Sequence, residues 1–210
     1  MIKKCLMFLC AALLAVQAQA NAPKPPDQVI QDATSNLQNL LREHHDEYKA
    51  NNALFQKVVN DAVVPHFDLP QIAQLVLGRN WRNATPDQRT RFQNAFKNML
   101  INAYASALLE YYDSVTVEWK PLRMPANATD VTVNSLLKRP GKQPVAIGFA
   151  MSLVDNDWKI YDITILDVSL VTSYRDQFGA EIKKNGLENT IQGIESGKLG
   201  VKPEVKTGGG

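Results

Sequence analysis

The sequence has very little cysteine. Its two cysteines, Cys5 and Cys10, both lie within the first twenty residues. The rest of the chain therefore has no disulfide, no thiol nucleophile and no cysteine ligand for a metal ion. A chain of this kind depends on a hydrophobic core, and 210 residues of which 45% are hydrophobic are enough to build one.

The chain also lacks an excess of either charge. It has 23 basic and 21 acidic residues, and two of the basic ones, Lys3 and Lys4, lie in the same N-terminal segment as the cysteines. Beyond that segment the charges balance. Proteins that neutralise nucleic-acid phosphates normally carry a basic excess, so the composition argues against a nucleic-acid partner.

No apolar run is long enough to cross a membrane. The run at 5–16 has twelve apolar residues, whereas about 20 are needed to span the hydrocarbon layer. Lys3 and Lys4 precede this run and Ala18-Gln-Ala20 follows it, which is the pattern of a secretory signal peptide. We predict three segments: a cleaved signal peptide at 1–20, one domain at 21–197, and a flexible tail at 198–210.

Common catalytic and metal-binding motifs are missing as well. The sequence has no Gly-x-Ser-x-Gly elbow, phosphate loop or dinucleotide fingerprint. His44 and His45 are neighbours that would point about 100° apart on a helix, and no carboxylate–histidine motif surrounds them or His66. We therefore predict surface or capping histidines, no metal site and no cofactor.

Helical spacing of apolar residues appears in six segments. The clearest start is Thr85-Pro-Asp-Gln88, in which Thr85 is the N-cap, the proline occupies the first helical position and Gln88 completes a capping box. A continuous apolar face then follows from Phe92 to Tyr111. The predicted helices occupy residues 29–50, 54–63, 69–77, 86–111, 170–182 and 187–194.

Between the predicted helices at 86–111 and 170–182, apolar residues recur every second position instead of at helical spacing. Alternating segments begin near Val115, Val131, Val145 and Trp158, with turns at Pro140-Gly141 and Asp155-Asn156. This spacing predicts a four-stranded antiparallel meander, with the helices segregated before and after it. The fold class is therefore α+β.

One enzymatic interpretation survives the motif search. Asp162 lies in the last predicted strand beside Tyr161, and Tyr104 and Tyr111 lie on the long helix, so a carboxylate base with a tyrosine donor could form in a pocket. This would be a small-molecule isomerase or dehydratase. The alternative, which we favour, is that Asp162 is a hydrogen-bonded structural residue and the tyrosines are part of the core.

A basic segment lies between two predicted helices. A tryptophan between arginines in a loop suits contact with a lipid headgroup or an acidic partner, and two further arginines extend the basic character. The competing interpretation is a solvated loop in which the tryptophan packs on the core. The candidate headgroup or docking residues are Arg79, Trp81, Arg82, Arg89 and Arg91.

Several segments, in order, carry a resemblance to a known family. They are Phe67-Asp-Leu69, Leu77-Gly-Arg-Asn-Trp-Arg82, Ala84-Thr-Pro-Asp-Gln88, Tyr104-Ala-Ser-Ala-Leu108, Trp158-Lys-Ile-Tyr-Asp162, Val168-Ser-Leu-Val171 and Tyr174-Arg-Asp-Gln-Phe178. Together they resemble the MlaC-like toluene-tolerance family, over the whole chain from the signal peptide to about Gly197. One departure is Asn80, which stands where many relatives have an aromatic residue.

The resemblance implies an NTF2-like fold and a periplasmic carrier, not an enzyme. Such a carrier binds phospholipid as cargo and moves it between an outer-membrane lipoprotein–porin complex and an inner-membrane ABC transporter with an MCE-domain ring, maintaining outer-membrane lipid asymmetry. It acts as a monomer with transient membrane contact. A protein that only tethers these partners is a third interpretation.

Apolar spacing suits either a packed core or a slot for acyl chains, and the resemblance selects the slot. We expect the slot between the third strand, the long helix and the segment after the sheet. Its predicted lipid-binding residues are Leu100, Tyr104, Leu108, Tyr111, Ile147, Phe149, Met151, Tyr161, Val171 and Tyr174.

Overall fold

The computed structural model describes residues 22–200, so the predicted signal peptide and residues 201–210 of the predicted tail lie outside the described residues. No helix in the described part is long and apolar enough to cross a membrane. The helical elements are α2 (Pro26–Ala50), α3 (Asn52–Ala62), the 3₁₀ turn η1 (Val64–His66), α4 (Leu69–Leu77), α5 (Asn80–Asn83), α6 (Pro86–Tyr111), α7 (Leu170–Asn185) and α8 (Leu187–Glu195).

Side-chain caps explain where α3, α4, α6 and α7 begin. The Thr85 hydroxyl accepts a hydrogen bond from the Gln88 N–H at 3.2 Å, and the Gln88 side chain accepts one from the Thr85 N–H at 3.1 Å, which confirms the capping box of α6. Asn51 and Asp68 cap α3 and α4 in a similar way. The one-turn helix α5 falls where we predicted a loop, because four residues are too few for an apolar period.

The sheet is fully antiparallel, with neighbours in chain order from β1 to β5. Its strands are β1 (Thr116–Trp119), β2 (Asp130–Lys138), β3 (Val145–Val154), β4 (Asp157–Ile165) and β5 (Val168–Ser169). The α+β class and the meander are confirmed. Asp155 and Asn156, with φ of 48° and 69°, form the predicted turn between β3 and β4.

The predicted count of four strands is too low by one. Leu166 and Asp167 have φ of 50° and 64°, and they return the chain so that Val168–Ser169 pairs with the end of β4. A two-residue strand has no detectable period, and a leucine in a tight turn gives no turn signal in the sequence.

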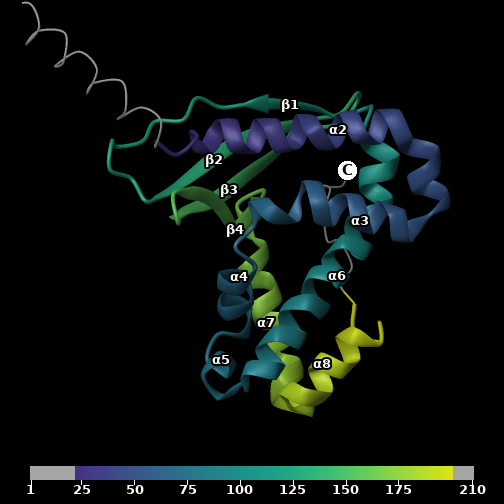
Figure 1. Ribbon diagram of the computed structural model, residues 1–210, viewed down its shortest axis with the longest axis vertical. Coiled ribbons are helices and arrows are strands. Elements are labelled where there is room, and N and C mark those ends of the chain that lie inside the picture. The colour runs from purple at the N-terminus through teal and green to yellow at the C-terminus, as the bar shows by residue number, and fades with distance from the viewer. Residues whose placement is uncertain (1–21, 201–210) are drawn as a thin grey trace, which may run out of the picture.

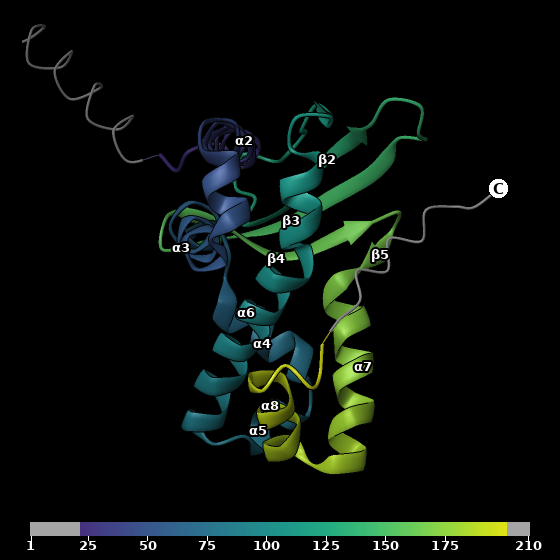
Figure 2. The ribbon, with the colours of Figure 1, turned by 90° about the vertical axis from the view of Figure 1, so that its right-hand side faces the viewer.

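Figures 1 and 2 show a sheet with α2 lying along it, and a group of helices that extends away from the sheet. The extended group contains α4, the first half of α6, α7 and α8. The second half of α6 returns to the sheet beside α2 and α3. The molecule therefore has a sheet end and a helical end, joined by α6 and α7.

Three hydrophobic clusters hold these parts together. The sheet core lies between α2 and the sheet and contains Ile30, Val131, Val133, Met151, Trp158 and Ile160. The helix core joins α4, α6, α7 and α8 and includes Val76, Leu77, Phe92, Phe96, Tyr174 and Phe178. The N-terminal core joins α2, α3 and α6 and contains Leu41, Tyr48, Phe55, Val59 and Ile101.

Candidate functional site

An apolar cavity of about 270 Å³ lies where the three clusters meet. Its wall combines side chains from the segment from α3 to α4, from α6, from β4 and from the start of α7. The lining residues are Val59, Val63, Val64, Phe67, Leu69, Ile72, Phe96, Lys97, Leu100, Ile101, Tyr104, Leu108, Tyr161, Asp162, Ile163, Leu170, Val171 and Tyr174. Close-packed cores contain few voids of this size, so the cavity is a candidate binding site.

Helix α6 supplies one side of the cavity. Phe96, Leu100, Tyr104 and Leu108 follow one another at intervals of four residues and all line it, because residues four apart share one face of an α-helix. Lys97 is the charged residue of α6 that lines the cavity. Its Nζ donates a hydrogen bond to the Asn60 side chain at 2.8 Å. Its ammonium is therefore held away from the apolar space, which is lined by its aliphatic stem.

Two tyrosines from opposite walls meet at the cavity. The hydroxyls of Tyr104 and Tyr174 are 3.3 Å apart, which is within hydrogen-bond distance. Burial, with a further contribution from Tyr104, raises the pKa of Tyr174 above its ordinary value. The Tyr174 hydroxyl therefore stays protonated at neutral pH, so it adds polarity to the cavity without charge.

Tyr161 lines the cavity, and its hydroxyl is bonded to a residue that does not line it. Its hydroxyl donates a hydrogen bond to Asp130 at 3.1 Å, and burial together with Asp130 raises the pKa of Tyr161 to about 12. The ring is thus fixed at the wall by a polar contact at its far end, as is common for buried tyrosine.

Asp162 is committed to the backbone of α7. Its Oδ1 accepts hydrogen bonds from the N–H of Ile163 at 2.8 Å and of Val171 at 3.0 Å, and its Oδ2 accepts one from the Ser169 hydroxyl at 2.6 Å. Ser169 in turn caps α7. A carboxylate with these three donors stabilises the start of a helix, which supports the structural interpretation of Asp162 over a catalytic base.

Six of the ten residues predicted for the acyl slot line the cavity: Leu100, Tyr104, Leu108, Tyr161, Val171 and Tyr174. Met151 does not. It is fully buried in the sheet core against α2, because α2 covers the end of the sheet where Met151 lies.

Ile147, Phe149 and Tyr111 lie outside the cavity wall. Phe149 is the direct antiparallel partner of Ile163, which lines the cavity, and Ile147 follows two residues away. Paired and alternate residues point to the same face of a sheet, so the face that borders the cavity continues over Phe149 and Ile147. Both are only partly buried, and Tyr111 is 36% exposed at the end of α6.

The predicted basic site lies at the opposite, helical end, and two of its arginines are engaged in the fold. Arg89 donates Nε and Nη2 to the Trp81 carbonyl at 3.1 and 2.9 Å, and its guanidinium lies 4.8 Å from the centre of the Trp81 ring. Trp81 also packs against the helix core. Arg79 and Arg82 are exposed.

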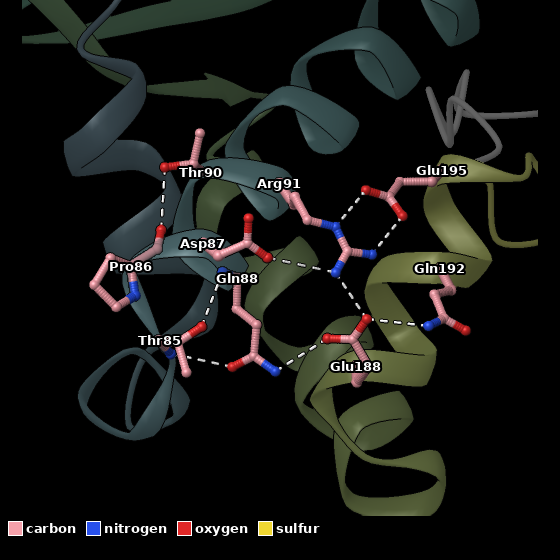
Figure 3. A network of polar contacts seen from close by, with 9 residues as sticks. All are labelled: Thr85, Pro86, Asp87, Gln88, Thr90, Arg91, Glu188, Gln192 and Glu195. Atoms are coloured by element: carbon pink, nitrogen blue, oxygen red, sulfur yellow. Dashed lines mark hydrogen bonds and ion pairs between the residues drawn. The ribbon is translucent and has the colours of Figure 1, made fainter.

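Arg91 joins α6 to α8 through a network of ion pairs (Figure 3). It donates to Glu195 at 2.9 and 2.7 Å and to Glu188 at 2.8 Å. Hydrogen bonds from Arg91 and two neighbouring amides lower the pKa of Glu188 to about 2. Arg91 therefore links α6 to α8, and each of its three guanidinium nitrogens already donates a hydrogen bond within the chain.

The sequence interpretation missed the wall formed by α3, η1 and α4. Val59, Val63, Val64, Phe67 and Ile72 all line the cavity, but their helical spacing is that of ordinary core residues. No local signal separates the two roles, since each side chain contacts the cavity only through tertiary packing.

A metal centre is not formed within residues 22–200, where no group of three histidine, cysteine, aspartate or glutamate side chains is placed to hold an ion. His45 instead stacks on Tyr112, with ring centres 4.9 Å apart, and contacts the Leu109 carbonyl at 3.1 Å.

The chain is an α+β protein in which a meander sheet and its helices line an apolar cavity, and comparison with known proteins identifies the family. The family model described as "MlaC protein" matches residues 31–196. The chain belongs to the MlaC family, which confirms the resemblance seen in the sequence.

Three relatives illustrate the match. The toluene tolerance protein ttg2D of Pseudomonas putida is 30% identical over 201 residues, covering 91% of this chain and 88% of that protein. The intermembrane phospholipid transport system binding protein MlaC of Haemophilus influenzae is 22% identical over 189 residues, covering 89% and 87%. A phospholipid-binding protein from Ralstonia solanacearum, solved in complex with a phospholipid, has a TM-score of 0.76 and 31% identity, with 82% of this chain and 96% of that chain covered.

Proposed function

We propose that this protein binds phospholipid and carries it through the periplasm, with acyl chain in the apolar cavity. The observation that carries the proposal is the cavity itself, about 270 Å³ of apolar space. Lys97 and the tyrosines that line it form hydrogen bonds with other side chains of the protein. The relatives named as phospholipid-binding proteins support the same cargo.

The energetics favour such a carrier. Moving methylene groups from water into an apolar environment is favourable by about 0.8 kcal/mol each. An apolar cavity of about 150 Å³ can hold one benzene ring, so by proportion this cavity has room for roughly ten carbon atoms of an acyl chain. Covering ten methylenes offsets about 8 kcal/mol of the cost of removing a lipid from a membrane.

The remainder of the lipid lies along the adjoining sheet face. Phe149 and Ile147 continue that face beyond the cavity and are only partly covered. They therefore offer apolar surface for the part of an acyl chain that the cavity does not hold. Burial of this kind needs no catalytic group, and the carboxylate at the wall, Asp162, is occupied by the start of α7.

The cellular role follows from the family and the predicted signal peptide. We propose that the exported chain moves lipid between an outer-membrane lipoprotein–porin complex and an inner-membrane ABC transporter with an MCE-domain ring, and that this traffic maintains outer-membrane lipid asymmetry. A balanced net charge suits a carrier that must leave an anionic membrane surface after docking.

The proposal is tested by extracting natively purified protein with organic solvent and identifying lipids by mass spectrometry. We expect glycerophospholipid in about one-to-one amount, and uptake of labelled phospholipid from vesicles by protein stripped of lipid. A protein that yields no lipid and takes none up would contradict the proposal.

A cavity variant makes the test specific. Val171→Arg places a charged group on the cavity wall and should abolish uptake, whereas Thr172→Arg, at the next and exposed position of α7, is the matched control and should retain it. Circular dichroism and thermal unfolding of both variants report whether the fold is kept.

A further inference from the structure

Arg139 has a buried donor with no partner. The Nε of its side chain is shielded from solvent and forms no hydrogen bond. Among residues 22–200 no carboxylate lies within ion-pair distance of its guanidinium, in contrast to Arg42 and Arg91, which both pair with acidic residues. Buried polar groups in folded proteins are nearly always hydrogen-bonded, and a bound ligand is one way to satisfy this exception.

Two elements hold Arg139 in place. It is the first residue of a β-turn between β2 and β3, in which the Lys142 N–H donates to the Arg139 carbonyl at 3.2 Å. Pro140 and Gly141 occupy the centre of this turn, and the φ of 67° at Gly141 is one that glycine adopts without strain. From the other side, the Tyr111 ring of α6 lies 5.4 Å below the guanidinium carbon.

An apolar face of the sheet runs from the cavity wall towards Arg139. Ile163 lines the cavity and pairs with Phe149, and the same face continues along β3 to Val145, which pairs with Leu137. Arg139 follows Leu137 by two residues. The distance from Phe149 to Val145 is four residues, or about 14 Å at about 3.4 Å per residue. One leaflet of a bilayer core is about 15 Å thick, so this face is about as long as one acyl chain.

We propose that Arg139 binds the phosphate of the phospholipid whose acyl chain occupies the cavity; this assignment rests on the proposed function. The planar guanidinium suits a phosphate because it can donate two parallel hydrogen bonds to its oxygens. The Tyr111 ring restrains the guanidinium before the lipid arrives, and the phosphate supplies the acceptor that Nε lacks. The headgroup site is thus at the sheet end, far from the basic segment around Arg79 and Arg82.

The test compares two labelled lipids with the same acyl chains: phosphatidylglycerol, and diacylglycerol, which has no phosphate. We expect Arg139→Gln to weaken binding of phosphatidylglycerol at least tenfold, or about 1.4 kcal/mol, and to change binding of diacylglycerol less than twofold. Arg139→Lys keeps the charge and should recover part of the loss. Arg123→Gln, which removes an exposed arginine between β1 and β2, is the matched control and should change neither.

Three results would overturn the assignment. Equal losses for both lipids would mean that Arg139 acts by packing the turn, and unchanged binding of phosphatidylglycerol would mean that it does not contact the lipid. Binding of glycerol 3-phosphate as tight as that of the lipid, with the same dependence on Arg139, would identify a site for free phosphate. If the unaltered chain takes up neither lipid, the proposed function fails; if uptake is normal and insensitive to Arg139→Gln, only the assignment fails.

Discussion

Filling the cavity should separate lipid binding from folding. Leu108 lines the cavity from α6 and is only partly buried. Leu108→Trp adds about six non-hydrogen atoms on that wall, and these atoms occupy the space of about six methylenes of the acyl chain. At about 0.8 kcal/mol for each methylene that can no longer be buried, the binding free energy falls by about 5 kcal/mol. This corresponds to a loss of affinity of more than about a thousandfold.

The same substitution should leave the fold intact. Overpacking a close-packed core costs about 1–3 kcal/mol, but a side chain that enters empty space meets no such clash. We therefore expect the free energy of unfolding in urea, measured on lipid-free protein, to change by less than about 1 kcal/mol. The neighbouring Ala107 is exposed on the other side of α6, and Ala107→Trp serves as the matched control.

The measurements are equilibrium binding of a labelled phospholipid and urea unfolding of the lipid-free protein. Loss of binding with normal stability in Leu108→Trp, and normal binding in Ala107→Trp, are the expected results. Unfolding by Leu108→Trp would show that the space around this residue is too small for a ligand. Undiminished binding would show that the lipid lies elsewhere, and either outcome would refute the reasoning.

Three further predictions concern the framework of the site. Met151→Ala should lower the free energy of unfolding by about 2–5 kcal/mol, because Met151 is fully buried in the sheet core; urea unfolding checks this, and a loss below about 1 kcal/mol would contradict a close-packed environment. Asp162→Asn should destabilise the start of α7 by about 1–3 kcal/mol, while phospholipid uptake remains. Amide hydrogen exchange measures the destabilisation of α7, and the uptake assay measures lipid binding. Loss of lipid uptake in a folded variant would indicate a functional role for Asp162. Arg91 lowers the pKa of Glu188 to about 2, so the stability contributed by ionised Glu188 is present above the ordinary carboxyl pKa of about 4.3 and is lost as pH falls towards 2. In thermal unfolding, Arg91→Gln should therefore be less stable than the parent at pH 6, and the difference should shrink between pH 4 and pH 2. A difference in stability that does not depend on pH would show that the ion pairs contribute nothing.

Much of the architecture is readable from local signals. Thr85 and Gln88 form the capping box that their spacing predicts, and Asn51 and Asp68 cap α3 and α4 through bonds to residues three positions away. Period-two apolar patterns located four strands, because neighbouring side chains on a strand face opposite sides. The fifth strand was missed, since Val168–Ser169 is defined by its pairing and not by its own composition.

The candidate site was readable only in part. The α6 stripe, Tyr161 on β4 and the start of α7 supplied six residues that line the cavity, but Met151 has the same apolar character and lies in a packed core. The difference between Met151 and the cavity residues is the element packed against each of them. Helix α2 fills the space over Met151, whereas the space beside Leu100 and Leu108 is left open. The spacing of apolar residues records which face is buried and not what buries it.

The arginines show the same division. Their positions suggested a docking site around Arg79 to Arg91, yet Arg91 is used by two glutamates about a hundred residues away along the chain. Among residues 22–200, Arg139, which had no sequence signal, is the arginine whose side chain has a buried nitrogen without a hydrogen-bond partner. The sequence by itself determined most of the helices and strands, the cap of α6 and the family, because these depend on neighbours in the chain. Only the tertiary structure decided which apolar faces leave space between them and which charges remain unpaired, because both depend on partners brought together by folding.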